Sequence, residues 1–187
     1  MSNWESGLLP ALGDMLAART PYPQEIPPVP DTILNVGALE SEIFELEEKL
    51  DISLPDSYKQ FLLVSNGIEL HDLYTEFLPT KKVGWLRDLV PWIVEEPIDD
   101  IRSTDEEYFN YGPDQDSITC RDEYLADCLM ISSELDGFVF LLNPSVKSNN
   151  GEWEAWDYGL KYPGAYRYRS FWELMCKLHS QLENRIT

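Results

Sequence analysis

The clearest hydrophobic pattern in the chain is a helical stripe early in its length. Leu39, Ile43, Leu46 and Leu50 stand three or four residues apart, and mostly acidic residues fill the positions between them. Side chains at this spacing share one face of a helix. The pattern therefore predicts an amphipathic helix over about 37–50, with a solvated acidic face.

A second, shorter helix is predicted over about 55–65. Pro55 suits the first helical position, where a missing N–H has no cost, and Asn66-Gly67 ends the helix because Gly accepts a left-handed C-terminal cap. One face of this helix, with Leu54 at its entry, is expected to be structural core rather than a contact surface for a partner. That face consists of Tyr58, Phe61, Leu62 and Ser65.

Apolar runs bounded by turn signals predict strands in the later part of the chain. Asp136-Gly137 is a hairpin signal, and Asn143-Pro144 is expected to end the strand that follows it. Trp156 is expected in the core. The predicted strands are 92–94 (a strand or a buried turn), 128–132, 137–143 and 153–157.

Capping patterns predict two further helices. Ser103 or Thr104 is placed to cap a helix near 103–109, and Ser170 with Glu173 forms a capping box at the start of the last helix. The apolar stripe of that last helix, in which Phe171 is expected to be core, is Phe171, Leu174, Met175, Leu178 and Leu182. Six prolines crowd residues 1–30, which are predicted to be an extension, and 31–187 are predicted to form one domain.

The two early helices carry a resemblance to a known family. Their acidic helix, Leu-Pro-x-x-Tyr-x-x-Phe-Leu element and terminal Asn-Gly resemble the Smi1/Knr4 family, also called the SUKH superfamily. The positions that carry the resemblance are Leu54, Pro55, Tyr58, Phe61, Leu62, Asn66 and Gly67. The resemblance implies an α+β fold, with a mostly antiparallel sheet and flanking helices in a single domain.

The net charge of the chain limits the classes of binding partner that it favours. The formal net charge is −20, and fourteen Asp and Glu residues against two basic residues lie between Glu95 and Asp136. Such charge disfavours nucleic acid and anionic membrane surfaces. It favours a basic protein partner, which it would attract electrostatically. A role of the charge in solubility or in adaptation to salt stays open at this point.

No complete set of residues for catalysis or metal binding stands out. Three scattered cysteines predict reduced thiols in a cytoplasmic protein, and no secretory signal or long apolar run is present. His71 and His179 lack the further ligands that a metal site needs, and no phosphate-binding or nucleophile motif occurs. We therefore expect no catalytic residue, no cofactor and no metal.

Contact with a partner is predicted in two places. The first is the acidic segment 95–107. Its charges repel one another, and a basic partner would relieve that repulsion. The second is an aromatic rim near Pro163-Gly164, because Tyr is favoured at interfaces; the alternative is that these aromatics cover the sheet. The predicted contact residues are Glu95, Glu96, Asp99, Asp100, Asp105, Glu106, Glu107, Tyr162, Tyr166 and Tyr168.

The resemblance supplies a function to test. Many bacterial members of the family are immunity proteins that neutralise a toxin, often a nuclease, and some fungal members are scaffolds in cell-wall signalling. Together with the charge, this predicts a non-enzymatic module that neutralises a basic toxin by stoichiometric binding. The alternative is a regulatory or scaffold module with a non-toxin partner.

Overall fold

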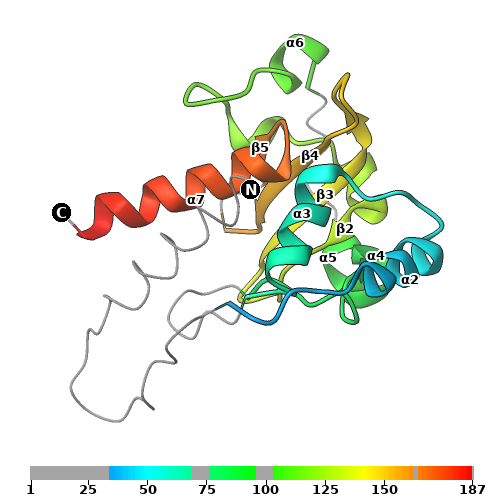
Figure 1. Ribbon diagram of the computed structural model, residues 1–187. Coiled ribbons are helices and arrows are strands. Elements are labelled where there is room, and N and C mark those ends of the chain that lie inside the picture. Colours follow the sequence, from blue (N-terminus) through cyan, green and yellow to red (C-terminus); the bar gives the residue numbers. More distant parts are fainter. Residues whose placement is uncertain (1–33, 69–75, 96–102, 162–163, 187) are drawn as a thin grey trace.

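A five-stranded antiparallel sheet forms the centre of the domain (Figure 1). The computed structural model describes residues 34–68, 76–95, 103–161 and 164–186, and of residues 182–186 only the backbone. Strands that neighbour each other in sequence also pair in space, in the order β1-β2-β3-β4-β5, so the predicted α+β fold is confirmed. The strands are β1 (Gly84–Trp85), β2 (Leu129–Met130), β3 (Phe138–Lys147), β4 (Trp153–Gly159) and β5 (Gly164–Tyr168).

Each face of the sheet is covered by its own hydrophobic core. Successive side chains of a strand point to opposite faces, so Ala155 of β4 lies in the first core and Trp156 in the second. The elements that cover the first face are α2 (Glu40–Leu50), α3 (Asp56–Val64) and α7 (Phe171–Ile186). Those near the second face are α4 (Leu86–Leu89), α5 (Pro91–Glu95), α6 (Asp105–Tyr108), η2 (Ser117–Thr119) and η3 (Asp122–Asp127).

Helix α3 packs its apolar face against the last helix. The Tyr58 and Phe61 rings each lie 5.1 Å, centroid to centroid, from the Phe171 ring, and Leu62 beside them is fully buried. Leu54 at the entry of the helix is 3% exposed. These residues are structural core, as predicted.

The ends of α2 and α3 differ from the predicted bounds by a few residues. Pro55 is the N-cap of α3 and not its first helical residue. The helix ends at Val64, and Gly67 beyond it has a φ of +84°. A Cβ on Gly67 would lie 2.6 Å from the Phe77 carbonyl oxygen, so Gly also permits the chain at 77–79 to approach. Helix α2 starts at Glu40 because the backbone just before it bonds to α3.

Two strand predictions are wrong in detail. Residues 92–94 lie in helix α5, because Pro91 fixes a helical φ and has no N–H to offer a strand ladder. Strand β3 continues through Pro144 to Lys147. Pro144 is tolerated there because β2 pairs only with residues 141–142 and the β3–β4 register shifts at this point.

The hairpin turn before β3 is confirmed. Asp136 and Gly137 both have positive φ, 56° and 83°.

Strand β5 was not predicted. A Cβ on Gly164, which has a φ of +117°, would lie 2.1 Å from the Ser117 carbonyl oxygen, so Gly lets η2 lie directly on β5.

Candidate partner-binding surface

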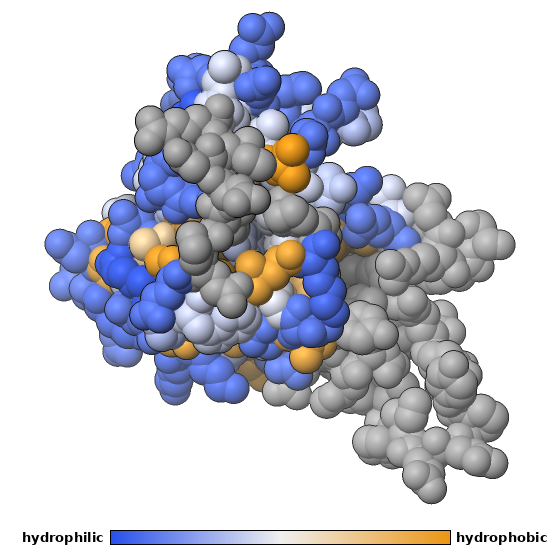
Figure 2. Space-filling model, turned by 180° about the vertical axis from the view of Figure 1, so that it is seen from behind, coloured by the Kyte–Doolittle hydropathy of each residue, from blue (hydrophilic) through white to orange (hydrophobic). Residues whose placement is uncertain are grey.

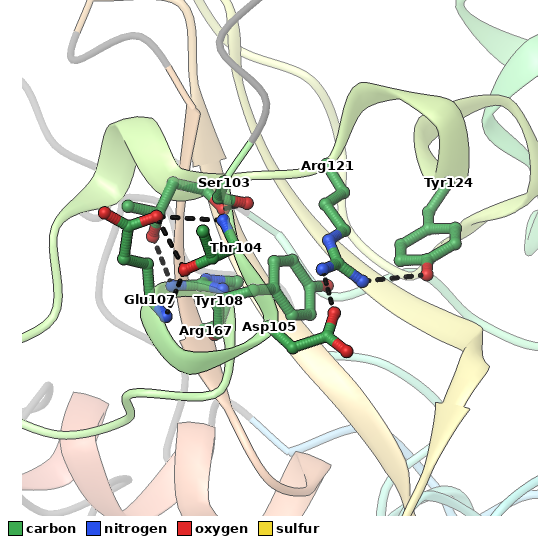
Figure 3. Close-up of polar contacts among 9 residues, drawn as sticks. Ser103, Thr104, Asp105, Glu107, Tyr108, Arg121, Tyr124 and Arg167 are labelled. Carbon is green, nitrogen blue, oxygen red and sulfur yellow. Dashed lines mark hydrogen bonds and ion pairs between the residues drawn. The ribbon is translucent and has the colours of Figure 1, made fainter.

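The acidic helix α6 is fixed by its own first turn. Of the two predicted caps, Ser103 and Thr104, Thr104 is the N-cap, and its hydroxyl accepts a hydrogen bond from the Glu107 backbone N–H at 3.3 Å. The Glu107 carboxylate accepts in return from the Thr104 N–H at 2.8 Å (Figure 3). Hydrogen bonds from the Thr104 backbone and then its side chain lower the pKa of Glu107. Glu107 therefore stabilises its own helix while its side chain stays exposed.

Asp105 has a cationic partner within the chain. The Arg121 guanidinium forms an ion pair with Asp105, and its carbon lies 4.5 Å from the centroid of the Tyr108 ring (Figure 3). The hydrogen bond to Asp105 raises the pKa of Arg121. The sequence indicated few basic residues near these acids, yet the fold brings Arg121 to Asp105 across sixteen positions.

Glu95 and Glu106 keep their charges unpaired within the described part of the chain. Both side chains are exposed, and no ion pair reaches either of them from the residues that the structure describes. The remaining three acids of the predicted contact set, which are Glu96, Asp99 and Asp100, lie outside the described residues. The structure therefore places Asp105, Glu106 and Glu107 together on α6 and puts Glu95 at the end of α5.

The aromatic rim is only partly exposed. Tyr166 on β5 is 41% exposed, whereas Tyr168 is half-buried and burial raises its pKa. Tyr162 lies outside the described residues. The neighbouring Arg169 stacks on the Tyr111 ring at 4.8 Å and pairs with Glu173 at 3.2 Å. Tyr166 is thus the member of the rim that the structure shows to be accessible.

Sequence reasoning missed a buried carboxylate beneath α6. Glu154 of β4 is 1% exposed. Burial of a charged carboxylate is costly unless hydrogen-bond donors surround it. Its four donors are the Tyr108 hydroxyl at 2.6 Å, the Tyr111 hydroxyl at 2.8 Å, the Asn143 amide at 3.1 Å and the Trp156 indole N–H at 2.6 Å. The signal was present, because Glu154 is two positions from Trp156, a predicted core residue, and so shares its face of the strand.

A buried arginine accompanies Glu154. Arg167 of β5 is fully buried, donates to the Tyr108 carbonyl oxygen, and donates to the Thr119 hydroxyl at 2.7 Å. Its guanidinium carbon lies 4.3 Å from the centroid of the Tyr108 ring. Tyr108 therefore contacts both buried charges, and burial together with Glu154 raises its pKa. We call Glu154, Arg167 and Tyr108 the polar core.

The family assignment rests on a match over most of this fold. Residues 37–177, from the approach to α2 into α7, match the profile of the SMI1 / KNR4 family (SUKH-1). The chain belongs to the SMI1/KNR4 family. The predicted resemblance is thereby confirmed, and the polar core lies inside the matched region. A search of curated proteins finds no match.

The SMI1/KNR4 domain holds α6 on its sheet through directional contacts. The polar core ties Tyr108, the last residue of α6, to β4 and β5. Gln115 adds a second tie, because its side chain accepts from the Arg167 N–H at 2.7 Å and donates to the Arg167 carbonyl at 3.1 Å. The outward acids of α6 are therefore presented on a fixed base.

The described part of the domain offers little for chemistry. Cys120 and Cys128 are free and buried, and desolvation raises the pKa of both thiols, which disfavours the thiolate. Within the described ranges no three His, Cys, Asp or Glu side chains are grouped to hold a metal ion. None of the helices that the structure describes has both the length and the apolar character that a membrane span requires. The absence of catalysis and of a cofactor stays a prediction.

Proposed function

We propose that this SMI1/KNR4 domain is an immunity-type module that neutralises a basic toxin by stoichiometric binding. Its acidic surface would cover the cationic residues with which such a toxin contacts its own target. A nuclease fits this description, because nucleases bind phosphate with basic sites. The proposal includes no turnover, only complementarity between two surfaces.

The observation that carries the proposal is the presentation of exposed acidic side chains on α6, a helix that the polar core holds on the sheet. Glu106 is exposed without an ion pair among the described residues, and Asp105 beside it is 80% exposed at its side chain despite its contact with Arg121. Charged side chains on a helix that is already fixed lose less conformational entropy when a partner binds. Glu96, Asp99 and Asp100 stay in the predicted contact set, together with the accessible Tyr166.

The first experiment identifies the partner and tests neutralisation. The full chain is used to capture proteins from the organism that encodes it, and each captured protein is expressed alone and together with the chain. The expected result is one basic protein that is toxic alone and harmless in a one-to-one complex. A captured partner that is not toxic would replace this proposal by the regulatory alternative.

The second experiment separates local from overall charge. Glu95→Gln with Glu106→Gln removes two charges at the proposed surface, and Glu45→Gln with Glu48→Gln removes two from the exposed face of α2. Because charges near an interface act mainly on association, the first pair should slow association severalfold at low salt and the second pair much less. Equal effects of the two pairs would mean that only the total charge matters.

A further inference from the structure

Two large aromatic side chains stand exposed at the described ends of the acidic segment. Trp92 on α5 is 43% exposed and lies three residues before Glu95. Phe109 directly follows α6 and is 47% exposed. Both rings are uncharged and largely apolar, so their exposure to water is unfavourable. On the face seen in Figure 2 the described surface is mostly hydrophilic, and its apolar residues lie at separate places.

The Phe109 ring is held by a buried neighbour, and the helix that carries Trp92 is anchored in the core. The Phe109 ring packs edge-on against Tyr108 with centroids 5.1 Å apart, and Arg121 lies 5.9 Å from its centroid. In the helix that carries Trp92, the next residue, Ile93, is fully buried. The Phe109 ring therefore has a supported side and an open side, and the backbone that carries Trp92 is fixed, so the loss of conformational entropy when a partner covers them is reduced.

Helix η3 connects the two places. Arg87 of α4 donates to the Ala126 carbonyl at 3.2 Å and pairs with Asp127 at the end of η3. Within η3, the Tyr124 ring lies 6.1 Å from the ring of Tyr108, the last residue of α6. Helix α4 thus contacts both α5 and η3, and η3 in turn contacts α6, with Glu123 as a further exposed acid on η3.

We infer that Trp92 and Phe109 are the apolar anchors of the proposed interface, and that they fit a basic protein with an apolar pocket for each ring. The inference rests on the proposed function. It assigns separate tasks to the two kinds of residue. The acids attract the partner and set the association rate, whereas burial of the aromatic rings holds the complex and sets the dissociation rate. The charge complementarity of the surrounding acids selects a basic partner over a second copy of this acidic chain.

The test measures binding kinetics with the captured partner, purified, as the probe. Trp92→Ser and Phe109→Ser are compared with Leu135→Ser, a matched control at a side chain that is 42% exposed before β3. Each anchor variant should dissociate about tenfold faster or more, with an unchanged salt dependence of association. Leu135→Ser should dissociate like the wild type. Thermal melts and circular dichroism confirm that each variant is folded.

Conservative variants keep the result interpretable if Phe109→Ser is destabilised. Trp92→Phe and Phe109→Leu keep an apolar side chain and should recover most of the lost residence time. Wild-type dissociation of both serine variants would overturn the inference and leave the proposed function standing if the Glu95 and Glu106 variant still associates slowly. Failure to capture any partner would overturn both.

Discussion

The two faces of the sheet are stabilised in different ways. On the first face, α3 and α7 meet through apolar side chains, among them the Phe61 and Phe171 rings, with Phe77 5.8 Å from Phe171. On the second face, apolar packing gives way near α6 to the polar core, where Glu154 and Arg167 are buried. Apolar contact is non-directional, whereas each buried charge needs particular donors or acceptors in particular places. Apolar burial therefore stabilises the domain on both faces, and the polar core on the second face in addition positions one segment of it.

The largest effect is expected on the first face. Phe61→Ala removes a fully buried ring and should lower the free energy of unfolding by roughly 3–5 kcal/mol. Leu63→Ala on the same helix, where the side chain is 42% exposed, is the control and should cost far less. Urea denaturation measures both. A Phe61→Ala protein that melts like the wild type but loses its partner would reverse the assignment of this face to structure.

The next effect should be local to the second face. Glu154→Gln replaces the carboxylate by an amide that cannot accept all four hydrogen bonds, at a cost of roughly 2–3 kcal/mol. Amide hydrogen exchange should accelerate most at 103–111 and least in α3. If exchange accelerates uniformly instead, the polar core contributes to the whole fold and does not position α6 in particular.

A smaller effect tests how α6 itself is held. Thr104→Ala removes the N-cap hydroxyl and should cost about 1 kcal/mol, whereas Thr104→Ser keeps the hydroxyl and should cost little. Because α6 is short, the loss should appear as faster exchange at Asp105–Tyr108 and hardly in the overall melting temperature. A fall in melting temperature as large as that of Glu154→Gln would show that α6 contributes to the stability of the whole domain.

The smallest effect concerns a single half-buried acid. Burial and then Glu123 raise the pKa of Asp122, and its Oδ1 has no hydrogen-bond partner among the residues that the structure describes. A raised pKa in the folded state means that the charged form destabilises the fold above that pKa, and that this penalty disappears as the pH falls through it. Asp122→Asn should therefore raise the melting temperature slightly at pH 7 and not at all near pH 3. An equal gain at both pH values would contradict the charge explanation.

The two faces also differ in how well their features could be predicted from the sequence. Helical spacing located α3 and the start of α7, because an apolar stripe such as Phe171, Leu174 and Met175 needs only some apolar surface to cover it. The cap of α6 was predicted as Ser103 or Thr104, since capping depends on residues close in sequence. By contrast, the burial of Arg167 was not predicted. Its partner Tyr108 is fifty-nine positions away, and no local pattern encodes that distance.

The contact between Gln115 and β5 has a consequence for solution behaviour. Strand β5 is at the edge of the sheet, where free N–H and C=O groups would otherwise be able to pair with a strand of another molecule. The Gln115 amide occupies both backbone groups of Arg167, so a single side chain takes the place of a sixth strand at that point. The protein thereby blocks this edge at Arg167 without a further β-segment, and edge-to-edge pairing with a strand of another molecule is hindered at that position.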